Sequence, residues 1–139
     1  MDHRRRRQLA FHGAIAIVLG LLAGFPFGFV LLEQMAGDVR AWRMAHLEGV
    51  MNGLLLWAAA GLGAALRLGD GAQRTLTWSL VVTAYGNTVA SILAAAAGVR
   101  GLAPGGTIAN TTVYLLFMIA LLAVFVAVGL VATGARERR

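Results

Sequence analysis

The strongest constraint on this chain is a series of four long apolar runs separated by short polar segments. Each run is long enough for a helix that crosses a bilayer core of ~30 Å. Of the 139 residues, 59% are hydrophobic and 13% are charged, which is far from the balance of a soluble domain. We therefore expect an all-α fold, a four-transmembrane-helix bundle forming one integral-membrane domain over residues 1–139. The expected spans are about residues 8–32, 44–66, 75–98 and 109–133.

The positive charge of the chain lies in the loops and near its ends. The sequence contains no lysine, so all 12 basic side chains are arginines, and with 6 acidic residues the net charge is +6. Nine arginines fall on one side of the predicted bundle and three on the other. This asymmetry predicts cytoplasmic termini, so the charge reflects topology in a lipid bilayer and no nucleic-acid partner is expected. The larger group is Arg4, Arg5, Arg6, Arg7, Arg67, Arg74, Arg136, Arg138 and Arg139, and the smaller is Arg40, Arg43 and Arg100.

The composition excludes several kinds of metal site. There is no cysteine, so disulfides, iron–sulfur clusters and thiolate metal sites are ruled out. The chain has three histidines, and Glu48 is the only carboxylate inside a predicted span. A zinc or di-iron site built by the protein alone needs carboxylates in pairs, so we do not expect one.

The second apolar run carries an unusual group of polar residues near its start. In a helix, Glu48 and Asn52 lie four residues apart on one face, and His46 lies on another. A polar group in hydrocarbon costs on the order of a few kcal/mol unless it is paired. This segment is therefore the candidate functional site.

His46 shares its predicted helix face with Gly49, Gly53 and Trp57. A haem needs one imidazole from the protein, and the two glycines could leave a flat surface for a porphyrin. With His46 as the one axial ligand, the sixth position on the iron stays open, which favours substrate chemistry over electron transfer. Glycine pairs of this kind more often form a helix-packing seam, so both roles remain open.

The third run carries a polar stripe with a strict four-residue spacing, formed by Thr75, Ser79, Thr83, Asn87 and Ser91. Such a stripe usually makes hydrogen bonds between helices, but it can also line a pocket. Candidate pocket residues are Ser91, Tyr114, Thr83 and Glu48.

Depth in the membrane can be estimated at ~1.5 Å per residue. This places Asn52, Asn87, Ser91 and Tyr114 in the same outer half of the bilayer as His46, which is expected ~3 Å from the outer end of its span. His12 is expected ~25 to 30 Å from His46, near the inner end, which is too far for the two to share a metal.

Three short motifs resemble the styrene oxide isomerase family of small bacterial inner-membrane proteins. The first is His12-Gly13, early in the first span. The second is Ala45-His46, followed six residues later by Asn52-Gly53, and the third is Tyr85-Gly86-Asn87. Chain length, span number and topology agree with the family as well, so the resemblance covers nearly the whole chain.

The resemblance implies a homotrimer with haem b held near the subunit interfaces, in the bacterial inner membrane with both termini cytoplasmic. It assigns His46 as the axial ligand of ferric iron, and Asn52 and Asn87 as catalytic residues on the substrate side. The family reaction rearranges a small aromatic epoxide to an aldehyde without net oxidation, with ferric iron as the Lewis acid. This chain has Ser91 where the family carries a tyrosine, so its substrate is open.

Two other functions fit the same residues. One is a membrane haem protein for electron transfer or gas sensing, with two axial ligands. The other is a small cofactor-free membrane subunit in which His46 only packs against a neighbouring helix or binds protons.

Overall fold

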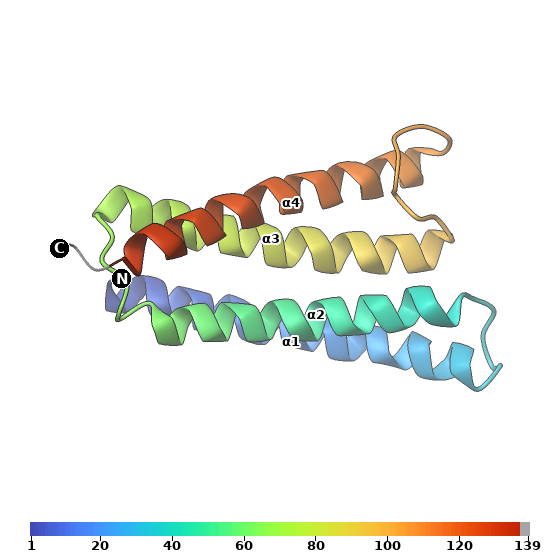
Figure 1. The fold of residues 1–139 in the computed structure, drawn as a ribbon. Helices are drawn as coiled ribbons and strands as arrows, with labels where there is room; N and C mark the ends of the chain where they lie inside the picture. The colour runs from blue at the N-terminus through green and yellow to red at the C-terminus, as the bar shows by residue number, and fades with distance from the viewer. Residues whose placement is uncertain (137–139) are drawn as a thin grey trace.

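The fold is an antiparallel arrangement of four long helices, seen in a computed structural model that describes residues 1–136 (Figure 1). The helices are α1 (His3–Leu31), α2 (Val39–Leu62), α3 (Asp70–Ala97) and α4 (Ile108–Gly134). No strand occurs within this described part of the chain. The predicted all-α class and the four-helix bundle are confirmed. Arg138 and Arg139, which entered the charge count above, lie outside the described residues.

Three of the helices, α1, α3 and α4, are long and apolar enough to cross a membrane. This identifies a membrane protein. Helix α2 has 24 residues and is not in that group. It carries His46, Glu48 and Asn52 in one segment, and these side chains lower its hydropathy. That α2 also crosses the bilayer therefore stays a prediction.

Helix boundaries differ from the sequence expectation where a polar residue caps a helix. Helix α2 begins at Val39, whereas we expected a loop up to Arg43, because the Asp38 carboxylate accepts a hydrogen bond from the Arg40 backbone N–H. In the same way Asp2 caps α1, so this helix begins at His3 and the arginines at positions 4–7 are helical. At the other end of α3, Gly98 adopts the left-handed conformation (φ 64°) and ends the helix.

The helices form two pairs, α1 with α2 and α3 with α4, and the pairs meet mainly through α2 and α3 (Figure 1). Helix α4 is the most apolar and least buried of the three candidate spans. Its buried residues recur every seven positions and face α3 as a narrow stripe. They are Val113, Ala120, Ala127 and Gly134.

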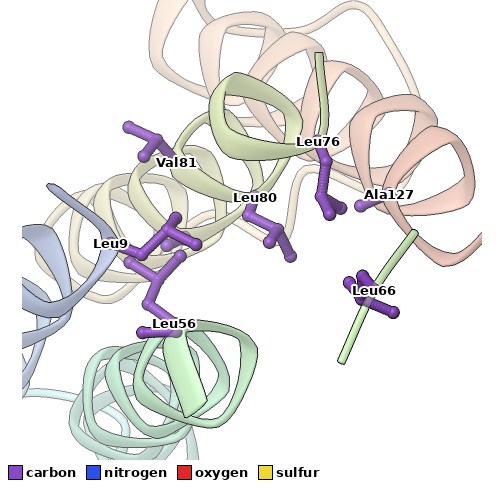
Figure 2. Packing of buried hydrophobic residues seen from close by; sticks show 9 residues of the cluster. Leu9, Leu56, Leu66, Leu76, Leu80, Val81 and Ala127 are labelled. Atoms are coloured by element: carbon purple, nitrogen blue, oxygen red, sulfur yellow. The ribbon is translucent and has the colours of Figure 1, made fainter. Parts of the chain in front are cut away.

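Two apolar clusters hold the pairs together. The cluster at the end that holds both termini contains Leu9, Leu56 and Leu80, with Ala127 from α4 beside Leu66 and Leu76 (Figure 2). The second cluster, at the opposite end, contains Ala23, Val30, Trp42, Ala45 and Ala95. We call the end with the termini the inner end and the opposite end the outer end. The candidate site lies toward the outer end.

Candidate functional site

The His46 side chain lies between α2 and α1 and is half-buried. Its Nδ1 lies 2.9 Å from the Gly20 carbonyl oxygen. Because a carbonyl can only accept, Nδ1 is the donor in this contact, and in the neutral ring Nε2 is then the nitrogen with the lone pair. The Phe27 ring stacks nearly parallel to the imidazole, with 6.3 Å between centroids and 14° between planes. Both contacts restrict the orientation of the ring.

This arrangement fits an axial ligand for a haem iron. A histidine that binds a metal usually donates its other ring N–H to a carbonyl or carboxylate, which fixes the tautomer and the ring orientation. Gly20 supplies that carbonyl for His46. The Nε2 atom has no hydrogen-bond partner within residues 1–136, so the nitrogen that would bind iron is not engaged by the protein.

The glycines beside His46 pack against α1. A Cβ atom added to Gly49 would overlap the backbone of Gly20, and one added to Gly53 would meet Ile17 and the Gly13 carbonyl. Both glycines are buried. The open surface that we expected for a porphyrin is therefore covered by α1 within the protomer, because small residues let the two backbones approach closely. Their observed role is the helix-packing seam.

Trp57 completes the same face of α2, as the spacing predicts. Its indole Nε1–H donates to the Ala10 carbonyl at 2.9 Å, and its ring lies over Gly13. On α1, Gly20 and Gly24 meet α2, whereas a Cβ atom added to Gly28, four residues farther on, would meet nothing within 4 Å. The seam is thus confined to the inner and middle parts of the pair.

Since α2 begins at Val39, His46 lies about 10 Å from the start of its helix. Its depth below the membrane surface stays a prediction. His46 sits level with Gly20 and Gly24 of α1, so His12 lies roughly 12 to 18 Å away along the helix axis. This separation is shorter than expected but still too long for a shared metal. Within residues 1–136 no group of three potential protein ligands gathers around one point.

Asn52 and Glu48 form a pair on the other face of α2. The buried Asn52 amide nitrogen donates to the Glu48 carboxylate at 2.7 Å and to the Glu48 carbonyl at 2.8 Å. Both amide protons are engaged, so the side chain of Asn52 presents only its oxygen to other partners. The contact orients the Glu48 carboxylate.

Glu48 and Ser91 line one groove of about 570 Å³ between α2, α3 and α4 at the outer end. Its rim carries Arg40 and Arg100, and Met44, Leu102 and Phe117 form apolar walls. An apolar hollow with a few convergent polar groups is the usual form of a small-molecule site. The predicted pocket residues Glu48 and Ser91 are therefore brought together.

The other predicted pocket residues are placed elsewhere. The Thr83 hydroxyl donates to the Ser79 carbonyl at 2.8 Å and approaches the Ala120 carbonyl at 3.3 Å, so it belongs to the α3–α4 contact. Tyr114 is half-buried beside Gly101 and does not line the groove. Asn87 is half-buried, and its amide makes no hydrogen bond within residues 1–136. Thr83 and Tyr114 do not line this groove, and their role as substrate-pocket residues stays a prediction.

His46 and the groove lie on different sides of α2. Two positions along a helix differ by ~200°, so His46 faces α1 while Glu48 faces the groove. The sequence pattern predicted the two faces, but it did not show that α1 and the groove would separate them.

One pair of polar residues was not anticipated. The His12 Nδ1 lies 3.0 Å from the Tyr85 hydroxyl, and the rings meet edge to face at 5.7 Å. The pair joins α1 to α3 across 73 residues of sequence. Both residues belong to the resemblance motifs, which is the one signal that could have drawn attention to them.

The fold and the polar faces of α2 define a helical membrane protein with an imidazole and an outer groove suited to small-molecule chemistry. The family model for styrene oxide isomerase matches residues 5–136, so the chain belongs to the styrene oxide isomerase family. A curated relative, hydroxylaminobenzene mutase HabB of Ectopseudomonas oleovorans, is 38% identical over 95 residues, covering 68% of this chain and 54% of the mutase. The chain thus spans about half the length of that relative.

Proposed function

We propose that this protein is a membrane-bound isomerase that uses ferric haem b to rearrange a small aryl epoxide, of the styrene oxide type, to an aldehyde. The observation that carries the proposal is the His46 imidazole, whose Nδ1 is held by the Gly20 carbonyl at 2.9 Å. Its Nε2 is left for iron. Membership of the styrene oxide isomerase family supports the same class of reaction.

When bound, the ferric iron supplies a Lewis acid for the substrate oxygen. The chain's own residues hold the ligand ring in place and orient the substrate. Gly20 and Phe27 set the plane of the His46 ring, and Asn87, whose amide is not engaged within residues 1–136, orients the substrate oxygen. No residue has to accept or supply electrons, because an epoxide and its isomeric aldehyde have the same formula.

The proposed assembly is a homotrimer with haem near the subunit interfaces. Within one protomer, His46 faces α1 and the Glu48 groove opens on the other side of α2. A second copy of the chain can bring a groove toward His46 without disturbing the α1–α2 seam. The proposed location is the bacterial inner membrane with both termini in the cytoplasm, which the arginine asymmetry supports.

A second candidate substrate is an arylhydroxylamine, and the Glu48–Asn52 pair favours it. Asn52 holds the Glu48 carboxylate at the wall of the groove. A carboxylate accepts a proton from an N–H or O–H group, whereas an epoxide has none to donate. Ser91 leaves more room than the family tyrosine, and the related mutase is named for hydroxylaminobenzene. In this alternative Glu48 binds the substrate and Asn52 is a positioning residue.

The cofactor is tested by the absorption spectrum of detergent-purified protein from haem-sufficient cells. We expect a high-spin ferric Soret band in the wild type and in His12→Ala, the matched histidine control, and its loss in His46→Ala. Equal bands in all three proteins contradict the ligand assignment. A low-spin bis-imidazole spectrum favours the electron-transfer alternative, and colourless wild type favours the cofactor-free one.

The substrate is tested by incubating the haem-loaded protein separately with styrene oxide and with hydroxylaminobenzene. The expected product has the same mass as its substrate, and phenylacetaldehyde is the product from styrene oxide. If hydroxylaminobenzene is the substrate, Glu48→Gln lowers its turnover roughly 100-fold. Asp70→Asn, a carboxylate-to-amide change at the inner end, serves as the control. No isomerisation of either compound by oxidised, haem-loaded protein contradicts both substrates and leaves the cofactor assignment intact.

A further inference from the structure

The inner end carries two adjoining hollows that share Arg74 and Trp78 of α3. One is a polar hollow of about 350 Å³ between α1 and α3, where Asp2, Arg4, Arg5 and Gln8 join the shared pair. The other is a mainly apolar groove of about 390 Å³ between α3 and α4, where Val82, Ile119 and Ala123 follow Trp78. A charged hollow therefore continues into an apolar groove that runs toward the middle of the bundle.

The helix arrangement leaves this surface open. Helices α1 and α4 make no close contact within the described residues, so α3 is uncovered between them (Figure 1). Trp78 and Ile119 are about half exposed, at 49% and 53%. No protein segment among residues 1–136 fills either hollow.

The positive charge of the polar hollow is only partly balanced by the protein, through Asp2 and Asp70. Arg5 is paired with Asp2 at 2.7 Å and with Asp70 at 2.6 Å. Arg4 and Arg74 are exposed, and neither makes a salt bridge within residues 1–136. Two arginines are therefore available to an anion beside an interfacial tryptophan.

We propose that the two hollows together bind one anionic phospholipid, with its phosphate on Arg4 and Arg74 and an acyl chain along Trp78, Val82 and Ile119. Basic pockets between membrane helices suit anionic head groups, and each arginine near the surface adds to the attraction. From Arg74 to Val82 the groove follows α3 for about 12 Å, which accommodates much of one acyl chain. A soluble phosphate would use the polar hollow alone, so the continuity of the two hollows selects a lipid.

The proposal is tested by native mass spectrometry of the full-length protein in detergent, with phosphatidylglycerol or phosphatidylcholine added. We expect retention of phosphatidylglycerol, and affinity weakened on the order of tenfold or more in the double variant Arg4→Gln, Arg74→Gln. The matched control, Arg43→Gln with Arg67→Gln, removes the same charge at positions that line neither hollow nor the outer groove, and it should bind as the wild type does. Equal loss in both double variants, or equal binding of the two lipids, overturns the proposal.

A separate experiment tests whether an acyl chain lies in the apolar groove. Val82→Trp fills the groove but keeps both arginines, and we expect it to weaken phosphatidylglycerol binding. Far-ultraviolet circular dichroism establishes that the variant is folded. Unchanged lipid binding by folded Val82→Trp, or full competition by glycerol phosphate, overturns the assignment to a lipid.

Discussion

The two ends of the molecule are held together by different forces. At the inner end, polar contacts join α1 to α3, as in the Arg5–Asp70 ion pair at 2.6 Å and the hydrogen bond from the Asp2 N–H to the Gln73 side chain at 2.8 Å. His12 and Tyr85 add a third such contact farther along. At the outer end, no hydrogen bond joins the α1–α2 pair to the α3–α4 pair within residues 1–136.

The two ends therefore have different roles: one stabilises the arrangement of the helices, and the other carries the candidate site. Apolar contacts such as those around Ala45 and Ala95 hold the outer end, and they leave the groove of Glu48 and Ser91 between the pairs. Apolar contacts have no preferred direction, so such a groove can adapt to a substrate more readily than a set of directional polar contacts. The inner end keeps the helices in register, while the outer end carries the candidate chemistry.

The largest expected effect comes from the α1–α2 seam that positions His46. Gly49→Ala places a Cβ against the Gly20 backbone, which cannot yield as a flexible side chain can. We expect a loss of about 1–3 kcal/mol in the free energy of unfolding, together with weaker haem retention. Gly28→Ala is the matched control, since its Cβ meets nothing within 4 Å, and it should be neutral or stabilising. Thermal unfolding in detergent measures both, and equal stability of the two variants contradicts the close seam.

The next effect concerns the outer groove. Ser91→Tyr restores the family tyrosine at a buried groove position, and we expect roughly a tenfold rise in kcat/KM for styrene oxide if substrate choice is decided there. Ser91→Ala removes the hydroxyl without adding bulk and should change turnover little. A folded Ser91→Tyr protein with unaltered selectivity between styrene oxide and hydroxylaminobenzene would place the substrate outside this groove.

The smallest effect tests the polar contacts of the inner half. Tyr85→Phe removes the hydroxyl that lies 3.0 Å from His12, and we expect a loss of about 1 kcal/mol in the free energy of unfolding. Tyr114→Phe is the control, because the Tyr114 hydroxyl makes no hydrogen bond within the described part of the chain. Chemical denaturation in mixed micelles compares them. If Tyr85→Phe and Tyr114→Phe are both as stable as the wild type, the His12–Tyr85 hydrogen bond does not stabilise the fold. The difference in stability between the two ends then comes from apolar packing alone.

The sequence by itself determined the four helices and the two faces of α2. In a membrane, a long apolar run can pair its backbone N–H and C=O groups within the same segment only by forming a helix. This requirement depends on neighbouring residues alone, so the sequence is enough to predict the helices. Helical periodicity likewise separates His46 from Glu48 and groups His46 with Gly49, Gly53 and Trp57, because it depends only on spacing along one helix. The polar character of this part of α2 could therefore be predicted from the sequence alone.

Only the tertiary structure decided what each face meets. It packs Gly49 and Gly53 against α1, places the Thr83 hydroxyl at the α3–α4 contact, and joins His12 to Tyr85. It also showed that capping by Asp38 starts α2 at Val39, earlier in the sequence than expected. These outcomes depend on the rotation and register of one helix against another, which arise from the summed packing of residues far apart in sequence and are not encoded in the spacing within any single helix.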